Sequence, residues 1–286
     1  MSYMHLSNLY KDQTILLFKE AFCLEKIHGT SAHLTWKDNK LICHPGGESA
    51  GRFAIALGGD EGVAKLNAAF TALGHADVKI YGEAYGGSQQ KMKATYGDKL
   101  KFIVFEVQVA DIWLNVENAA DVAAKLGLEF VHYKRVPATV EALDAERDAP
   151  SVQAVRNGMG DGHHREGIVA RPIEEMLNNR GERVICKHKR DEFKETATPR
   201  DVDPAQLKVL ADAEAVALEW VTDMRLEHVL QKFPEPHGIE ITGKVVKAMV
   251  EDVAREGAGE FVDTPEARKA ISTRASKMYR ALATKV

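Results

Sequence analysis

The sequence has few cysteines, no excess of positive charge and no long apolar run, and each absence excludes a class of protein. Its cysteines are Cys23, Cys43 and Cys186, an odd set without metal-ligand spacing, which predicts neither a disulfide framework nor a zinc site. Lys and Arg number 38 against 42 Asp and Glu, for a formal net charge of −4. The chain is therefore not a globally basic nucleic-acid binder, and any polyanion must bind to a local patch.

Secretion and membrane signals are also missing. The first residues lack a basic start followed by an apolar run, and no apolar stretch approaches the length that spans a membrane. Together with the cysteine usage, this predicts an intracellular, cytoplasmic protein without membrane contact, encoded by a cell or a virus. With 286 residues, of which 45% are hydrophobic, the chain can bury one good core and a smaller second one.

The chain has two parts of different texture. Up to about residue 200, short β-rich runs alternate with Gly, Asn and Asp turn signals, which predicts an α+β domain with antiparallel sheet flanked by helices. Its expected elements are strands at 32–36, 78–81 and 102–109, a hairpin turn at 37–40, and helices at 60–73 and 119–126.

A domain boundary is expected near residue 200, where the proline-containing segment 198–204 ends the β-rich texture. From 201 to 286 the sequence is rich in Ala, Leu, Glu, Lys and Val without strand alternation, which predicts a small all-helical C-terminal domain. Its expected helices are 207–230, 243–255 and 264–283.

The most informative segment is residues 25–31, EKIHGTS. Lys26 can attack a phosphorus only as the free amine, whereas its reference pKa of about 10.4 leaves it almost wholly cationic at pH 7. A site that uses it must depress that pKa through burial and nearby positive charge. In an extended segment Lys26 and His28 share one face, while Glu25 and Ile27 point the other way and would contact a nucleotide through backbone atoms. A lysine considered alone is far more often a solvated surface residue.

A second pair of cations lies near the end of the β-rich part. Lys187 and Lys189 stand two apart, so in a strand both ammonium groups project from one face. Such a pair can contact phosphates and stabilise the charge that develops when a triphosphate is attacked. The alternative is an edge strand whose lysines prevent aggregation.

Acidic and aromatic residues complete the candidate site. Glu166 precedes a glycine and two β-branched residues, and its carboxylate suits Mg²⁺, directly or through water; the alternative is an ion pair with Arg165 or Arg171. Glu83 suits the hydroxyls of a ribose. Phe105 offers a face for adenine stacking, although a Phe in such a run is more often a core residue. Alternation sends Glu106 away from Phe105, which ranks it lower as a site residue.

In order and spacing these segments resemble the covalent nucleotidyltransferase superfamily of ATP-dependent ligases and capping enzymes. Within it, the chain is similar to the double-strand-specific RNA ligases, the RNA ligase 2 group, over about residues 20–200. The helical tail is similar in kind to the C-terminal domain of that group, and no segment resembles the β-barrel that DNA ligases append. The matching motifs are EKIHGT at 25–30, YGExxG at 81–86, FxVF with a following acid at 102–106, EGxV at 166–169 and KxK at 187–189.

The resemblance implies a three-step reaction with ATP as AMP donor and Mg²⁺ or Mn²⁺ as metal. Lys26 takes AMP from ATP, AMP passes to an RNA 5′-phosphate, and a 3′-hydroxyl displaces AMP at a nick in a duplex. The chain would act as a monomer on RNA. The implied roles are a nucleophile at Lys26, nucleotide contacts at its neighbours Glu25, Ile27 and His28, a ribose contact at Glu83, adenine stacking on Phe105, metal placement by Glu166, and phosphate contacts at Lys187 and Lys189.

Three positions depart from the pattern of that group. Ser31 stands where Asn is frequent, His44 is the only candidate for a basic residue just before Gly46, and Glu106 stands where Asp is usual. These departures concern substrate contacts in the later steps rather than self-adenylation. Two other classes remain open: a self-adenylating enzyme that transfers AMP to proteins, and a nucleotide-binding RNA scaffold without covalent chemistry.

The clearest local excess of positive charge lies at residues 267–286, which contain no acid. This stretch suits RNA phosphates, with an affinity that falls as salt rises. The alternative is a C-terminal helix whose cations complement its dipole. The cations are Arg268, Lys269, Arg274, Lys277, Arg280 and Lys285.

Overall fold

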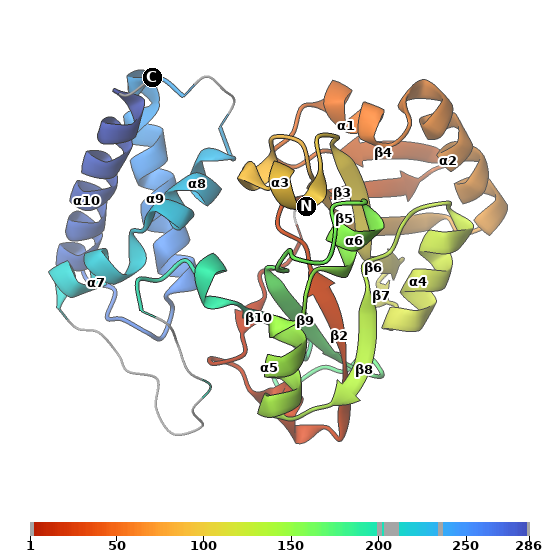
Figure 1. Cartoon of the computed structure of the whole chain (residues 1–286), viewed down its shortest axis with the longest axis horizontal. Helices are drawn as coiled ribbons and strands as arrows, with labels where there is room; N and C mark the ends of the chain where they lie inside the picture. The colour runs from red at the N-terminus through yellow and green to blue at the C-terminus, as the bar shows by residue number, and fades with distance from the viewer. Residues whose placement is uncertain (1–2, 199–201, 203–211, 234–236, 285–286) are drawn as a thin grey trace. The chain divides into compact units, whose positions relative to one another are not determined.

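The computed structural model describes residues 3–198, 202, 212–233 and 237–284 (Figure 1). The chain forms two compact units, residues 1–190 and 191–286, and each is described by itself. The domain boundary expected at residue 200 lies outside the described residues. No helix in the described part of the chain is long and apolar enough to cross a membrane.

Two five-stranded sheets form the first unit and confirm the α+β prediction. Strands pair antiparallel in both sheets except for one parallel pair, between β1 and β10. Sheet A has the order β1 (Ser7–Asn8), β10 (Cys186–Lys189), β9 (Gly167–Pro172), β2 (Glu20–Lys26) and β8 (Tyr133–Pro137). Sheet B has the order β4 (Lys40–His44), β3 (Thr30–Lys37), β5 (Asp77–Tyr85), β6 (Lys101–Val109) and β7 (Ile112–Trp113).

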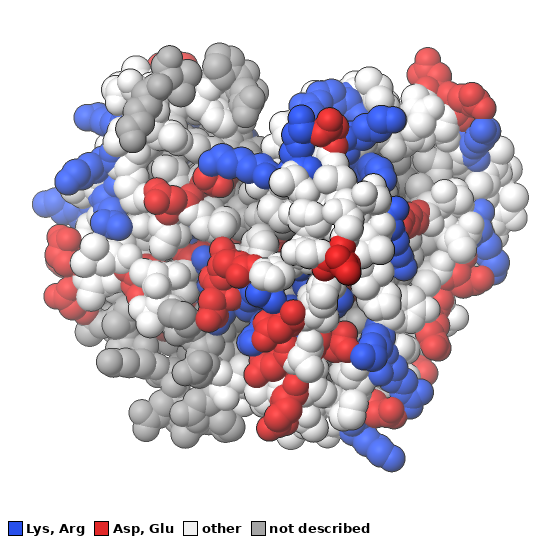
Figure 2. All heavy atoms as spheres, in the orientation of Figure 1, with Lys and Arg blue, Asp and Glu red and all other residues white. Residues whose placement is uncertain are grey.

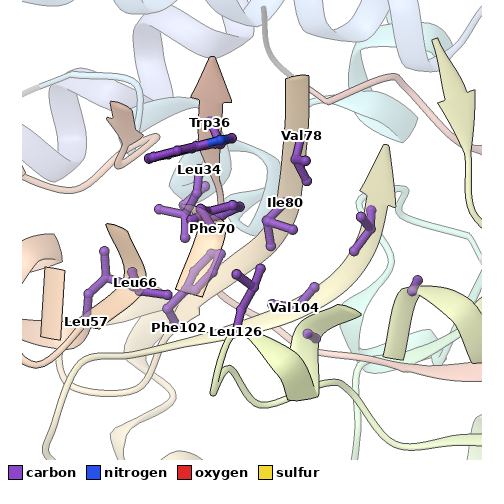
Figure 3. Close-up of a cluster of buried hydrophobic side chains, with 14 of the residues drawn as sticks. Leu34, Trp36, Leu57, Leu66, Phe70, Val78, Ile80, Phe102, Val104 and Leu126 are labelled. Carbon is purple, nitrogen blue, oxygen red and sulfur yellow. The ribbon is translucent and has the colours of Figure 1, made fainter. Parts of the chain in front are cut away.

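Helices α1 (Ala50–Ala56), α2 (Gly59–Leu73) and α4 (Val116–Lys125) cover one face of sheet B (Figure 1). Apolar side chains at alternate strand positions meet these helices in the main core, as period-two patterning requires. Figure 3 shows Leu34, Ile80 and Val104 pointing from neighbouring strands toward Phe70 on α2. The opposite face of sheet B carries Glu83 and Phe105 of the candidate site.

The predicted hairpin is confirmed. Asp38 and Asn39 join β3 to β4 with φ values of 51° and 56°, the left-handed pair that a two-residue turn needs and that Asn and Asp tolerate. The predicted helices at 60–73 and 119–126 correspond to α2 and α4. The remaining short elements of this unit are η1 (Thr14–Leu17), η2 (Gln89–Lys91), α3 (Lys93–Tyr96), α5 (Val140–Asp148) and α6 (Val152–Arg156).

A β-bulge interrupts the pairing of β5 with β6. Tyr81 pairs with Glu106 and Gly82 pairs with Val104, so Phe105 has no partner on β5. An extra residue in one strand reverses the alternation beyond it. Phe102, Val104 and Val107 accordingly pack in the main core, whereas Phe105 and Glu106 both face away from it.

The second unit is helical in its described part, with η3 (Asp191–Phe193), α7 (Ala213–Trp220), α8 (Asp223–Leu230), η4 (Ile239–Ile241), α9 (Thr242–Glu256) and α10 (Pro265–Ala283). Its core includes Trp220, Met249 and Tyr279. The predictions for 243–255 and 264–283 are confirmed by α9 and α10. A single helix over 207–230 is wrong within the described residues, because the Thr222 side chain caps a new helix by accepting from the Arg225 amide. The start of that predicted helix lies outside the described residues.

Candidate active site

One buried carboxylate gathers three of the expected site residues. Glu166 Oε2 lies 3.0 Å from Lys26 Nζ and 3.2 Å from His28 Nδ1, and its Oε1 lies 2.8 Å from Lys189 Nζ. The side chains of Glu166 and Lys189 are 2% and 7% exposed, whereas that of Lys26 is 23% exposed. Lys26 is therefore the cation of this group that solvent, or a ligand arriving from solvent, reaches most easily.

The register of sheet A brings these side chains together. Gly167 at the start of β9 pairs with Lys26 on one side and with Lys189 on the other, so the residue before it stands beside both lysines. A Cβ at Gly167 would lie 2.1 Å from the His188 carbonyl oxygen, and the glycine has a φ of 150°. Only glycine allows so close an approach of the two strands at this point.

Glu166 is an ionised carboxylate in this arrangement. Burial alone would raise its pKa, but the charges of Lys189, Lys26 and His28 together hold that pKa well below its ordinary value. A negative charge is thus maintained beneath Lys26 and Lys189 throughout the neutral range. Glu166 can therefore hold Lys26 and Lys189, or a metal ion, in place over that range of pH.

Glu83 lies next to this group but has a different ionisation. Burial raises the pKa of Glu83 to about 7, against the opposing effect of Lys26 and with a contribution from the Glu166 charge. Its Oε1 accepts a hydrogen bond of 3.1 Å from the Gly29 amide. A Cβ at Gly29 would lie 2.3 Å from the Ala84 carbonyl oxygen, so this glycine lets the segment after Lys26 approach β5.

The two lysines of β10 occupy alternate positions, as expected. His188 between them lies on the other face, where its Nε2 is 2.6 Å from Asp144 Oδ1 on α5. Lys187 pairs with Val169 and Lys189 with Gly167 along β9. Lys187 therefore shares a strand face with Lys189, although the contact to Glu166 is made by Lys189.

The side chains of Glu25 and Ile27 have their partners outside this group. Glu25 accepts hydrogen bonds from the Ser151 hydroxyl at 2.6 Å and from the Val152 amide at 3.0 Å, at the start of α6. Ile27 packs in an apolar cluster that includes Phe22 and Tyr85. The structure does not bring these two side chains to Glu166, and their nucleotide contacts stay a prediction for backbone atoms.

Phe105 and Glu106 lie on the same face of sheet B, which corrects the expectation that alternation separates them. The bulge is the reason, because it turns both side chains away from the helix-covered core. Phe105 is partly buried, and Glu106 is 1% exposed. Glu106 Oε1 lies 2.9 Å from Arg171 Nη1 and 2.5 Å from Arg183 Nη2, and Glu106 Oε2 accepts from the Tyr3 hydroxyl.

Sequence reasoning missed the partners of Glu106. An acid inside an apolar strand needs a buried partner, and Arg171 within an equally apolar run was a usable indication of one. The alternative for Glu166, an ion pair with Arg165 or Arg171, is wrong. Arg171 pairs with Glu106 and Glu175, and Arg165 donates to the Pro150 carbonyl oxygen at 2.8 Å.

Comparison with known proteins gives this geometry a family. The model of the family described as "RNA ligase" matches residues 19–189, more than half of the chain and the whole segment that forms the site. The chain belongs to the RNA ligase family. No curated protein sequence matches this RNA ligase family member.

Solved structures of an RNA ligase share its fold. Naegleria gruberi RNA ligase with PPi has a TM-score of 0.52 at 16% identity, covering 68% of this chain and 57% of that one. A mutant of the same ligase with ATP and Mn has a TM-score of 0.51 at 16% identity, covering 68% and 56%. The chain thus spans a little over half the length of these structures, and the likeness establishes the nucleotidyltransferase-like fold.

No group of three or more His, Cys, Asp or Glu that could enclose a metal ion occurs among the described residues. Mg²⁺ seldom needs one, since it usually binds one or two carboxylates together with substrate phosphates and water. Glu166 meets that requirement as an ionised carboxylate whose oxygens already bind cationic groups. The residues of this RNA ligase family member therefore fit a metal held jointly with a phosphate.

Proposed function

We propose that the protein is an ATP-dependent RNA ligase that joins 3′-hydroxyl and 5′-phosphate ends through a lysyl-AMP intermediate on Lys26. The observation that carries this proposal is the placement of Lys26 and Lys189 on the one buried, ionised carboxylate of Glu166, with Glu83 beside them. A solvated strand lysine would have no such surroundings. The family match and the ATP complexes of the Naegleria ligase support ATP as the AMP donor.

The first step requires an unprotonated amine at Lys26 and cations that meet the phosphates. The Lys26 amine, once unprotonated, forms a bond to the α-phosphorus of ATP while the bond from that phosphorus to pyrophosphate breaks. Charge that develops on the phosphate oxygens and on pyrophosphate meets Lys189 and Lys187, which share one strand face. Glu83, when ionised, accepts from ribose hydroxyls, and Phe105 stacks on adenine.

A divalent metal completes the charge balance in this proposal. Glu166 would hold Mg²⁺ or Mn²⁺ against the phosphates, and the bound metal would neutralise part of their negative charge. The Naegleria ligase structures with ATP and Mn support a divalent ion in this role. Lys26 and Lys189 contact the same carboxylate, so their charges would add to that of a metal held there.

The finer assignment is to the RNA ligase 2 group acting at nicks in duplexes. The motif spacing and the helical second unit support it. Figure 2 shows Lys and Arg side chains along the left margin, over α10. Exposed cations of α10 suit phosphate contacts with the RNA, and they include Lys269, Lys277 and Arg280.

Incubation with α-labelled ATP and Mg²⁺, followed by denaturing electrophoresis, tests the proposal. Wild type should carry the label and Lys26→Ala should not, because the substitution removes the nucleophilic amine. Lys40→Ala, on the exposed hairpin, is the matched control and should label like wild type. Nicked RNA added next should take up the label and be sealed.

Three outcomes separate the alternatives. If wild type purified free of AMP stays unlabelled across pH and metal, a non-covalent RNA scaffold replaces the ligase. If the label forms but passes to protein and never to RNA, the chain is a protein AMP transferase. If Lys26→Ala still labels, the nucleophile is another residue.

A further inference from the structure

The N-terminal segment contacts both sheets that carry the candidate site. Ser7 and Asn8 form β1, which pairs in parallel with Cys186 and Lys187 at the edge of sheet A. The Leu9 amide donates to the Lys187 carbonyl oxygen at 2.8 Å. A few residues earlier, the same segment packs Tyr3 against sheet B, so it spans from the phosphate-contacting strand to the strand that carries Phe105.

The Tyr3 ring lies among aromatic side chains of sheet B. It meets Phe105 edge to face, with centroids 5.0 Å apart and planes at 73°. Its centroid is 5.2 Å from that of Tyr81 and 6.2 Å from that of Trp113. The hydroxyl donates to Glu106, which Arg171 and Arg183 also contact. The ring is thus fixed at both its edge and its polar end.

Phe105 needs such support because of the bulge. The pairing of β5 with β6 passes over Phe105, so the strand ladder does not fix its backbone on that side. The direction of its side chain therefore depends on what packs against the ring. One side of the ring packs against the cluster that includes Ile27 and Tyr85, and Tyr3, itself held by Glu106, packs against it from the N-terminal segment.

We propose that Tyr3 is a positioning residue for the nucleobase: its ring holds Phe105 in the orientation that stacks on adenine, and so sets the affinity for ATP. The inference rests on the proposed function, because it requires that Phe105 contact the base. Burial and the neighbouring Glu106 charge raise the pKa of Tyr3 well above its ordinary value, which keeps the hydroxyl a donor to Glu106 over the whole working range of pH. The contacts of Tyr3 are with aromatic rings and with Glu106, so its loss should affect recognition of the base alone.

The test measures lysyl-AMP formation against ATP concentration for wild type, Tyr3→Ala, Tyr3→Phe and the control Leu17→Ala, whose side chain is 85% exposed. Tyr3→Ala should raise the KM for ATP about five- to tenfold, the effect of one lost aromatic contact, with the rate at saturating ATP within twofold of wild type. Tyr3→Phe retains the ring and should restore a KM close to that of wild type.

Two further measurements exclude a general loss of structure. Inorganic tripolyphosphate has no base, so its inhibition constant should be the same for Tyr3→Ala and wild type. In a Phe105→Leu background, Tyr3→Ala should have no further effect on KM, because the two residues act through one contact.

Several results would overturn the inference. An unchanged KM in Tyr3→Ala would show that Tyr3 does not affect binding of the base. A lowered KM would show that Tyr3 competes with the base. Equal weakening of ATP and tripolyphosphate, or an undiminished effect in the Phe105→Leu background, would also overturn the inference. Failure of wild type to form lysyl-AMP at all would instead refute the proposed function, which keeps the two failures distinct.

Discussion

Replacing Glu83 by Gln should remove a large pH dependence from the stability of the first unit. Burial raises the pKa of Glu83 from its ordinary value of 4.5 to about 7, so the folded state favours the protonated form. A raised pKa contributes stability that is fully present below the pKa of the unfolded chain and is lost as the pH rises through the folded value. Gln has the shape of the protonated acid and cannot ionise.

The magnitude follows from the size of the shift. Each pKa unit corresponds to about 1.4 kcal/mol. Between pH 5 and pH 8, the free energy of unfolding of wild type should therefore fall by about 2.5 kcal/mol relative to Glu83→Gln. Groups that do not interact with Glu83 titrate equally in both proteins and cancel in this difference. The hydrogen bond from the Gly29 amide can persist, because the Gln side chain retains an acceptor oxygen.

Urea unfolding followed by tryptophan fluorescence measures the difference. Trp36 and Trp113 lie in the first unit and Trp220 in the second, so a Trp220→Phe background makes the fluorescence specific to the first unit. Glu61→Gln is the matched control, since the Glu61 side chain is 80% exposed. The reasoning would be refuted if the difference in free energy of unfolding between wild type and Glu83→Gln stayed constant within about 0.5 kcal/mol from pH 5 to pH 8.

The Glu166 carboxylate and helix α10 give two more predictions. Glu166→Gln should destabilise the first unit by about 3–5 kcal/mol, because it removes the buried charge that contacts both Lys26 and Lys189. Adding Lys189→Met should restore part of that loss, and strict additivity in urea unfolding would contradict the coupling. On α10, neutral substitutions should lower the slope of log affinity for nicked RNA against log salt by about 2 to 3, with lysyl-AMP formation unchanged. An unchanged slope would remove the helix from the RNA interface; the substitutions are Lys269→Gln, Lys277→Gln and Arg280→Gln.

Local rules predicted much of the fold and part of the site. The Asp38-Asn39 turn, α9 and α10 follow from turn chemistry and helical spacing, which depend on neighbours in sequence. The shared strand face of Lys187 and Lys189 follows from alternation alone. Motif resemblance implied that Lys26, Glu166 and Lys189 belong to one site. The contact of both lysines with the Glu166 carboxylate was not predicted, because it depends on the strand register at Gly167.

The features that could not be predicted arise from distant contacts or from breaks in a pattern. Alternation assumes an uninterrupted ladder, and the bulge at Phe105 breaks it without any local mark in the sequence. The Tyr3–Glu106 hydrogen bond joins residues 103 positions apart. The end of α7 and start of α8 depend on one capping threonine, Thr222, within a stretch whose composition favours a continuous helix.

The placement of Glu166 beneath two lysines also determines how a polyphosphate can enter. Each ammonium already has a carboxylate oxygen within 3.0 Å, so the site is not a bare cationic surface that attracts any anion. A triphosphate must compete with Glu166 for the same cations, and binding becomes an exchange of counterions. Anions that offer too few charges, or place them at the wrong spacing, gain little from that exchange. The protein has a net charge of −4, which further disfavours non-specific binding of small anions. A ligand that contacts several of the lysines at once can still displace Glu166.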